Sequence, residues 1–297
     1  IRSAEFVGLF ANTTVATVVN VGMVDSDIKG NNSTGSLVGQ ANGGTITGYN
    51  TGKVSGDHRV GGLVGSAENS TITGYNMGAV SGTGNRVGGL VGQATQVNLS
   101  GYNRGEVNGG DHVGGLIGTD NGGSTIKGYN TKAVSGISMI GGLVGVGNSG
   151  STIEGYNTGD VTGTVAYLGG LIGYAAENLI LTGYNEGKVS EKTSGTVYAI
   201  GGLVGWANQI ILTGYNLGEV NGNEYVGGLL GNDYGGSTII GYNTENISGK
   251  KCVGGLVGAL RSGSTLTGYN TGDVSGNAYV SGLVGYKENA TLTGFVV

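Results

Sequence analysis

The tripeptide Gly-Tyr-Asn recurs along the whole chain at an almost constant spacing. Its tyrosines follow one another at intervals of 26, 27, 27, 27, 28, 31, 27 and 27 residues in a chain of 297 residues. A repeat of this length predicts one elongated stack of units, each in contact with its neighbours, rather than one or two globular domains. The nine tyrosines are Tyr49, Tyr75, Tyr102, Tyr129, Tyr156, Tyr184, Tyr215, Tyr242 and Tyr269.

Each repeat divides into three short strand-like pieces separated by glycines. In the first piece an aliphatic residue, Ile46, stands beside the polar Thr47, and this pairing of types recurs in later repeats. Such alternation is typical of a strand with one buried face. The second piece centres on Val54, and the third carries Val60 together with a leucine that never varies. That leucine is Leu63, Leu90, Leu116, Leu143, Leu171, Leu203, Leu229, Leu256 and Leu283.

These features predict an all-β fold, a parallel β-helix (β-solenoid) with about 27 residues and three short strands in each coil. Glycine every few residues disfavours helix. The crossover preference predicts right-handed winding. Glycines are expected to supply corners with positive φ and to let the backbone turn tightly. Residues 1–34 are expected to form a degenerate N-terminal capping coil, with Val19 aligned on Tyr49, and residues 35–297 about ten coils, the last one open.

Two ladders are expected along the stack. Asn50 and its equivalents, once stacked, can hydrogen-bond to one another up and down the coils. The tyrosines are expected to form a stacked, mostly buried aromatic ladder. Phe295 and Val19 lack a hydroxyl at the corresponding position, which indicates that the ring is not fully exposed to water. The alternative is an exposed tyrosine stripe that binds a ligand, since strict alternation from Ile46 places Tyr49 outside.

One insertion interrupts the period, between Ser190 and Ala199. Beside it the outward position after the Gly-Leu-Val-Gly motif becomes aromatic, at Tyr174 and at Trp206, and Tyr198 lies in the insertion itself. These three residues either cover a protruding loop or form a platform on which sugar rings stack. The second interpretation makes Tyr174, Tyr198 and Trp206 the candidate ligand-binding residues, because long loops on repeat scaffolds often form the binding face.

Composition narrows the classes of function. The net charge is −5 and basic residues form no run, which argues against nucleic acid as a partner. No apolar stretch approaches the ~20 residues of a membrane span. The two histidines, His58 and His112, and the single Cys252 stand in no zinc-binding spacing, and acidic residues are not grouped for glycoside hydrolysis. The sequence therefore predicts no catalytic residue, metal or cofactor.

The repeated Gly-Leu-Val-Gly core, the Tyr-Asn-Thr-Gly-(Asp/Lys)-Val-Ser-Gly segment and the opening Asn-Val-Gly-Met-Val-Asp-Ser-Asp-Ile closely resemble GLUG-motif repeat proteins. The resemblance covers essentially the whole chain. That family occurs in large bacterial exoproteins, including adhesins and non-catalytic parts of some immunoglobulin A proteases. The resemblance implies an extracellular, surface-exposed β-solenoid. It implies no catalytic residue at any position of this chain, because the motif itself is structural.

The expected function is therefore that of a non-enzymatic extracellular scaffold or stalk of an adhesin-like protein. Its expected partners are host glycans or surface proteins, contacted through variable outward residues. The alternative is a subunit of an extracellular filament that stacks end to end through its open terminal coils, because head-to-tail contacts propagate without closing.

Overall fold

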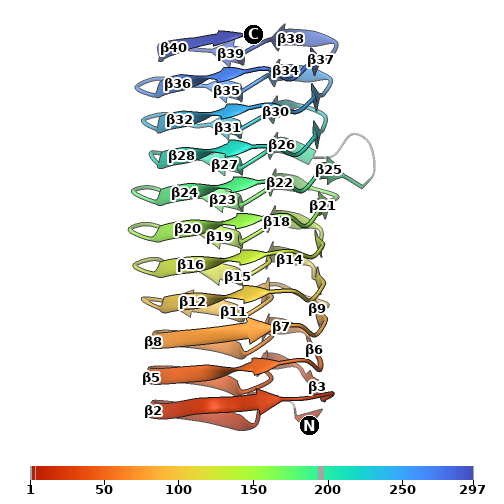
Figure 1. The fold of residues 1–297 in the computed structure, drawn as a ribbon, viewed down its shortest axis with the longest axis vertical. Coiled ribbons are helices and arrows are strands. Elements are labelled where there is room, and N and C mark those ends of the chain that lie inside the picture. The colour runs from red at the N-terminus through yellow and green to blue at the C-terminus, as the bar shows by residue number, and fades with distance from the viewer. Residues whose placement is uncertain (1, 4, 193–196, 297) are drawn as a thin grey trace.

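The structure of the chain, a computed structural model, describes residues 2–3, 5–192 and 197–296. Within these ranges the chain forms short strands joined by tight turns and bends, and it contains no helix. The strands stack as successive coils along one long axis, from the N-terminal coil at the bottom of Figure 1 to the C-terminal coil at the top. The predicted parallel β-solenoid, with about 27 residues in each coil, is confirmed.

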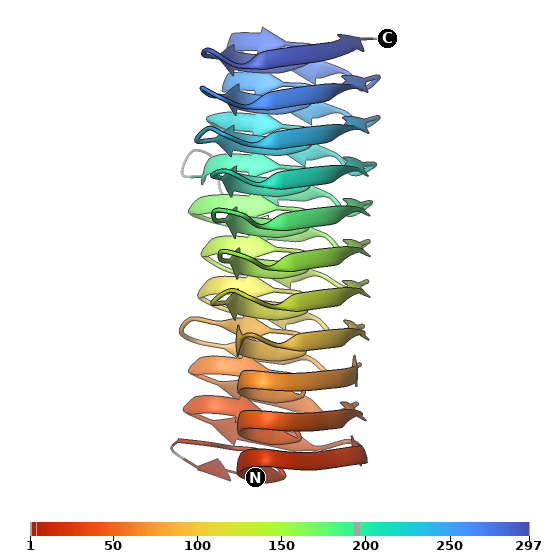
Figure 2. The same ribbon diagram turned by 90° about the vertical axis from the view of Figure 1, so that its left-hand side faces the viewer.

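The coils wind in a right-handed sense. In Figure 1 the nearer strands, such as β8 (Val64–Asn76), run from left to right while the chain rises. In Figure 2, seen from the side, the nearer strands again run from left to right. A climbing chain whose near side always runs to the right is a right-handed coil, as the crossover preference predicts.

Each coil contributes to three parallel sheets, two of which consist of very short strands. The first sheet contains β1 (Arg2–Ser3), β3 (Asp27–Gly30), β6 (Lys53–Gly56), β9 (Val80–Gly82), β13 (Val107–Asn108), β17 (Val134–Ser135), β21 (Val161–Gly163), β25 (Val189–Glu191), β29 (Val220–Asn221), β33 (Ile247–Ser248) and β37 (Val274–Ser275). The second contains β4 (Asn32–Gly35), β7 (His58–Gly61), β10 (Val87–Gly88), β14 (Asp111–Gly114), β18 (Ser138–Gly141), β22 (Ala166–Gly169), β26 (Val197–Gly201), β30 (Tyr225–Gly227), β34 (Lys251–Gly254) and β38 (Ala278–Ser281).

The third sheet folds back at the turn of each coil, so that its two halves lie on either side of the larger core. Its first strands are continuous: β2 (Phe10–Met23), β5 (Val38–Asn50) and β8. Thereafter a tight turn divides the strand of each coil into two parts. These are β11 (Val91–Thr95) with β12 (Asn98–Asn103), β15 (Ile117–Asp120) with β16 (Thr125–Asn130), β19 (Val144–Gly147) with β20 (Thr152–Asn157), β23 (Ile172–Ala175) with β24 (Ile180–Asn185), β27 (Val204–Ala207) with β28 (Ile211–Asn216), β31 (Leu230–Asp233) with β32 (Thr238–Asn243), β35 (Val257–Leu260) with β36 (Thr265–Asn270), and β39 (Val284–Lys287) with β40 (Thr291–Val296).

The third predicted strand begins and ends differently from the prediction. Val60 lies in β7 of the second sheet, Leu63 lies at a bend, and Val64 begins β8 of the third sheet. Leu63 and its equivalents up to Leu256 are fully buried, and Leu283 is partly buried. The leucine ladder therefore fills the corner between two sheets instead of one face of a strand.

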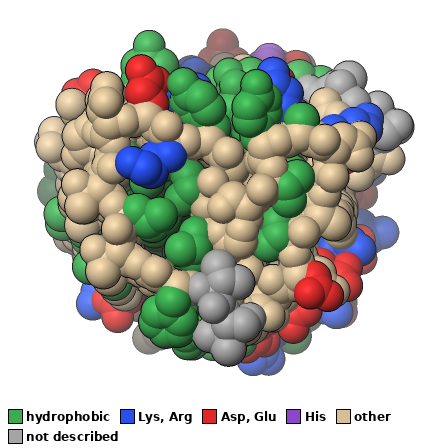
Figure 3. Space-filling view, turned by 90° about the horizontal axis from the view of Figure 1, so that it is seen from above, with side chains coloured by type: hydrophobic (Ala, Val, Ile, Leu, Met, Phe, Trp, Pro, Cys, Tyr) green, Lys and Arg blue, Asp and Glu red, His purple; other side chains and the backbone are tan. Residues whose placement is uncertain are grey.

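Aliphatic side chains fill two separate compartments in each coil. The larger lies inside the third sheet, where the leucine ladder packs with the columns that contain Val64 and Ile72. The smaller lies between the first and second sheets and contains Val54 and Val60. Viewed down the long axis in Figure 3, hydrophobic side chains lie within a rim of backbone and polar groups, and most charged side chains lie at the periphery. Stacking of each coil on the next thus buries both aliphatic columns.

The glycines of the Gly-Leu-Val-Gly motif allow the coils to approach one another closely. A Cβ atom on Gly62 would lie 2.1 Å from the carbonyl oxygen of Gly89 in the next coil, and one on Gly89 would lie 2.0 Å from that of Gly115. None of these three glycines has positive φ; among glycines that angle occurs at turns, as at Gly122 and Gly123. The prediction that glycines supply corners with positive φ is therefore confirmed at these turns, whereas the glycines of the Gly-Leu-Val-Gly motif are needed for close backbone packing.

The asparagine that follows each tyrosine forms an unbroken, buried ladder. The Nδ2 atom of Asn157 donates to Oδ1 of Asn185 at 2.8 Å and to the carbonyl oxygen of Gly159 at 2.7 Å. Its Oδ1 atom accepts from Nδ2 of Asn130 at 2.8 Å and from the backbone N–H of Gly159 at 3.2 Å. From Asn50 to Asn270 the bonds between successive side chains measure 2.7–2.9 Å. The predicted asparagine ladder is confirmed, and Asn157 satisfies both its donors and both its acceptor positions.

The N-terminal coil stacks on β5 with a register different from the predicted one. Val18 pairs with Ile46 as expected, but an irregularity between Val18 and Val21 makes Gly22 the partner of Tyr49. The alignment of Val19 with Tyr49 is therefore wrong. A Cβ atom on Gly22 would lie 2.2 Å from Cζ of Tyr49, so the glycine leaves the space that this first ring occupies.

Candidate functional site

The three aromatic residues predicted to bind a ligand lie together on the outer side of two successive coils. Tyr174 in β23 is the ladder partner of Trp206 in β27, and Tyr198 lies in β26 of the same coil as Trp206. The rings of Tyr174 and Trp206 stack, with centroids 4.6 Å apart and planes 2° apart. Tyr198 joins this pair through Tyr167, whose ring centroid lies 6.2 Å from that of Tyr198 and 6.0 Å from that of Tyr174.

Three aromatic residues that the sequence did not single out extend this group. Tyr225 lies with its ring centroid 4.9 Å from that of Tyr198, and Tyr234 lies 5.7 Å from Trp206. Tyr167 and Tyr225 share one column of the second sheet, with Ala199 between them. That shared position in the repeat is the signal by which the sequence could have identified them. We call the whole group the loop-side aromatic cluster: Tyr167, Tyr174, Tyr198, Trp206, Tyr225 and Tyr234.

A β-bulge explains how Tyr198 reaches the cluster. Ala166 pairs with Val197 and Tyr167 pairs with Ala199, so Tyr198 is the extra residue on β26. A bulge re-aims the side chain of its extra residue, and Tyr198 is 39% exposed. The predicted insertion includes residues 193–196, which lie outside the described residues.

The arrangement of the rings limits what the cluster can offer to a ligand. A platform for sugar rings needs open aromatic faces, whereas Tyr174 and Trp206 stack on each other and Tyr167 lies against both. Tyr234, 64% exposed, is the most accessible ring of the cluster. The cluster therefore presents ring edges, hydroxyl groups and the side chain of Tyr234 to a partner.

One phenol of the cluster, that of Tyr225, has a strongly raised pKa. Burial, and next the hydrogen bond with Tyr198, raise the pKa of Tyr225 to about 12, so its phenol stays protonated at physiological pH. The guanidinium carbon of Arg261 lies 5.9 Å from the centroid of the Tyr225 ring. Arg261 also donates through Nη1 to the carbonyl oxygen of Asp233 at 2.8 Å, which fixes the cation at the edge of the cluster.

The predicted tyrosine ladder lies on the outer side of the third sheet. Successive rings from Tyr49 to Tyr269 have centroids 4.8–5.2 Å apart and planes 1–8° apart, and Phe295 continues the stack at 5.5 Å. All nine tyrosines are half-buried, while the asparagines beside them are buried. The stacked ladder is confirmed, but its rings are half-buried rather than mostly buried. Strict alternation from Ile46 holds, because Gly48 does not turn the strand inward.

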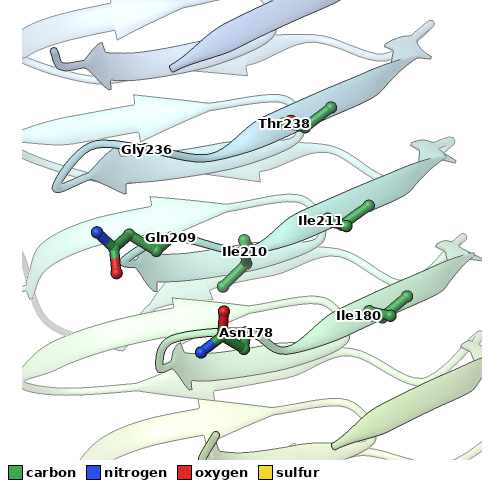
Figure 4. Close-up of a pocket in the computed structure, with 7 residues that line it drawn as sticks. All are labelled: Asn178, Ile180, Gln209, Ile210, Ile211, Gly236 and Thr238. Carbon is green, nitrogen blue, oxygen red and sulfur yellow. The ribbon is translucent and has the colours of Figure 1, made fainter. Parts of the chain in front are cut away.

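A shallow depression lies on the same outer face, beside the turns of the third sheet (Figure 4). Ile180, Ile211 and Thr238 occupy one column of β24, β28 and β32. Asn178 and Gln209 lie at the neighbouring turns. Ile180 is 41% exposed and Ile211 is 48% exposed, where most other coils carry threonine. The outer face is therefore most apolar along these two coils.

A buried carboxylate lies at one turn of the third sheet. Oδ1 of Asp120 accepts from Oγ of Ser124 at 2.6 Å and Oδ2 accepts from Oγ of Ser151, in the next coil, at 2.5 Å. Burial raises the pKa of Asp120, although the hydrogen bonds from Ser124, Ser151 and the N–H of Gly122 act in the opposite direction. Asp233 repeats the arrangement with Ser237 and Ser264.

The raised pKa of Asp120 predicts a pH dependence of stability. The folded state holds this proton more strongly than the unfolded chain, whose value is ~3.9, so the contribution to stability grows as pH falls toward that value and is lost as pH rises through the folded pKa. A tenfold difference in proton affinity between the two states corresponds to ~1.4 kcal/mol. In urea unfolding at pH 7 and pH 4, the difference in free energy between wild type and Asp120→Asn should shift in favour of wild type at pH 4. Parallel pH profiles for the two proteins would contradict this.

Within residues 2–3, 5–192 and 197–296, no group of three or more His, Cys, Asp or Glu side chains could hold a metal ion. No helix in that part of the chain is long and apolar enough to cross a membrane. Comparison with protein-family models, with curated proteins and with solved structures finds no match for this chain. The loop-side aromatic cluster and the tyrosine ladder are therefore candidate binding sites on the basis of their geometry alone.

Proposed function

We propose that the chain is a non-enzymatic β-solenoid scaffold that acts outside the cell, as a stalk or display module of the adhesin type. The resemblance to GLUG-motif repeat proteins supports an extracellular location and a role as an adhesin-type scaffold. The single observation that carries the proposal is the asparagine ladder, bonded at 2.7–2.9 Å between every successive pair from Asn50 to Asn270. A buried ladder without a break favours one straight, rigid arrangement of the coils.

The partner is contacted, in this proposal, through outward residues that differ between coils. The loop-side aromatic cluster supports this, because aromatic side chains gather there on an otherwise repetitive surface. Tyrosine and tryptophan are enriched at protein interfaces, where one end of the side chain is buried and the other reaches water. The proposed partner is either a host glycan or a host surface protein, and a binding screen distinguishes the two.

Substitution of the central ring tests this proposal. Trp206→Ala removes the ring that contacts Tyr167, Tyr174 and Tyr234, and truncation of such an anchor typically costs ~2 kcal/mol or more in binding. Binding of the purified chain to a glycan array and to host cells should fall more than about tenfold. Met77→Ala, at a residue 50% exposed on a distant coil, is the matched control. If Trp206→Ala bound as well as Met77→Ala, the cluster would not be the binding surface, and only the role of a spacer would be left for the chain.

End-to-end assembly stays a prediction. In such an assembly the strands of a terminal coil pair with those of a second copy, because head-to-tail contacts propagate without closing. Particles that lengthen with protein concentration in electron microscopy would favour assembly.

A further inference from the structure

Three basic side chains occupy successive positions of one column in the second sheet. Arg59, Arg86 and His112 each precede a core valine, and those valines pair directly from coil to coil. Parallel strands lie ~4.8 Å apart, so the column carries three basic groups within about 10 Å. The next coils carry Met139 and Tyr167 at the same position. We call Arg59, Arg86 and His112 the basic column.

The basic column lies against neutral polar side chains at the corner between the second and third sheets. Nε of Arg59 donates to Oε1 of Gln93 at 2.8 Å, and its Nη1 donates to Oδ1 of Asn32 at 3.4 Å. Nδ1 of His112 lies 3.1 Å from Oγ1 of Thr119. Gln93 and Thr119 are ladder partners in the third sheet, so both sheets supply polar groups to this corner. These contacts orient the basic groups, but none of them brings a negative charge.

Arg86, in the middle of the basic column, has no partner for its guanidinium group. In the part of the chain that the structure describes, no hydrogen bond or ion pair involves this side chain, and its Nε atom is buried. Buried polar groups almost always have a hydrogen-bond partner, so an exception calls for an explanation. Nη2 of Arg59, in the adjacent coil, also has no partner among the described residues. The two guanidinium groups therefore keep terminal N–H donors that a ligand can engage.

The charges around the basic column sum to a positive potential. Burial, and next the like charge of Arg59, lower the pKa of Arg86. Burial and then Arg86 lower the pKa of His112, and Asp111 opposes them with a smaller effect. The nearby Asp57 accepts from a threonine hydroxyl at 2.6 Å and pairs with a histidine at 3.5 Å, so its carboxylate is engaged elsewhere. An anion bound at the column would relieve the repulsion between these cations.

We propose that the basic column binds a tetrahedral oxyanion, a sulfate or phosphate group, held between Arg59 and Arg86 and bordered by His112. Guanidinium groups on adjacent coils lie at a spacing that lets one anion accept from both, and arginine presents a fork of N–H donors that matches such oxygens. The site is separate from the loop-side aromatic cluster and does not depend on the proposed function. The anion is either a free inorganic ion or the sulfate group of a sulfated sugar, and the experiment distinguishes these two sources.

The Nε–H signals of arginine in heteronuclear NMR spectra report binding directly, because the chain has only five arginines. Sodium sulfate is titrated into the full chain, with sodium chloride at equal ionic strength as the reference. Saturable shifts are expected at Arg59 and Arg86, but not at Arg104 or Arg261. Arg86→Gln should weaken binding about tenfold, and Arg86→Lys, which keeps the charge but loses the fork, several-fold. Arg104→Gln, on the tyrosine ladder, is the matched control and should leave the affinity unchanged.

A monosulfated disaccharide and its unsulfated form distinguish the two sources of the anion. Tighter binding of the sulfated sugar than of inorganic sulfate, lost in Arg86→Gln, would assign the site to a sulfated sugar, whereas equal or weaker binding would assign it to the free ion. Circular dichroism verifies the fold of each variant, and Arg59→Gln takes the place of Arg86→Gln if the latter does not fold. Three results would each overturn the proposal: no saturable shift, shifts of equal size at all five arginines, or unchanged affinity in the folded variant.

Discussion

Replacement of Gly155 by alanine should prevent the middle coils from stacking and should abolish cooperative folding of the rod. An ideal Cβ atom there would lie 1.8 Å from the carbonyl oxygen of Gly128 and 2.9 Å from its carbonyl carbon. Neither strand can retreat, because Glu154 and Tyr156 on either side pair in register with the coils above and below. Since these contacts are with backbone, the expected cost exceeds ~4 kcal/mol.

Gly150→Ala is the matched control for that substitution. Gly150 has φ of +75°, and a Cβ atom there would meet no atom within 4 Å. Only the strain of a left-handed backbone should appear, ~1–2 kcal/mol. Soluble yield and the urea midpoint, measured for both variants, check the contrast. If Gly155→Ala were no less stable than Gly150→Ala, the close approach of the coils at this column would be wrong.

Removal of one rung of the asparagine ladder should produce the second large effect. Asn157→Ala deletes four hydrogen bonds and leaves Oδ1 of Asn185 and both backbone groups of Gly159 without these partners in a buried site. Each buried polar group left unsatisfied costs ~1–3 kcal/mol, so a total loss of roughly 4 kcal/mol or more is expected. Asn98→Ala, at an exposed position of β12, should change stability by less than about 0.5 kcal/mol.

Asn157→Asp separates hydrogen bonding from packing at the same site. Aspartate has nearly the same shape, but it has no donor for the carbonyl oxygen of Gly159 or for Oδ1 of Asn185. It would bring a carboxylate oxygen against two acceptors in a buried environment. We expect this variant to be at least as unstable as Asn157→Ala at pH 7 in urea unfolding. Wild-type stability in Asn157→Asp would show that the ladder contributes only packing.

The repeat period and the alternation of residue types were sufficient to predict the solenoid, the aliphatic residues that fill its interior and the asparagine ladder. Each depends on one residue type that returns at a fixed offset, and stacking in register brings such residues together. The position of the corner between the second and third sheets could not be predicted, because Val60 and Leu63 are both apolar and both point inward. Only the path of the backbone shows that Leu63 lies at the bend between two sheets.

The backbone angles could not be inferred from residue type. Positive φ recurs at one column of the second sheet, where the residues are as different as Arg59, His112, Met139 and Cys252. Of these four residue types only histidine is enriched in that conformation. Contacts with the neighbouring coils impose the positive φ at this column. The sequence of one repeat does not reveal these contacts, and it therefore predicts positive φ only at glycines.

The candidate site could be predicted only in part. Tyr174 and Trp206 come together because they share one column, which the period reveals. Tyr198 enters through a one-residue bulge, and the ring contacts of Tyr225 and Tyr234 follow from it and from the adjacent coil. A bulge changes the register by an amount that spacing alone does not specify. The outward direction of the tyrosine ladder depended on whether Gly48 bends the strand, which composition does not decide.

Distances between spin labels along one column test the stacking of coils most directly. Thr73, Thr182 and Thr267 lie in the same outward column, four and seven coil steps apart when counted from Thr73. In a Cys252→Ser background, labels at cysteines in these positions should give narrow distances of about 19 Å for Thr73 to Thr182 and about 34 Å for Thr73 to Thr267 by electron–electron double resonance. Distances that are broad, or that do not grow in proportion to the number of coils, would contradict the solenoid.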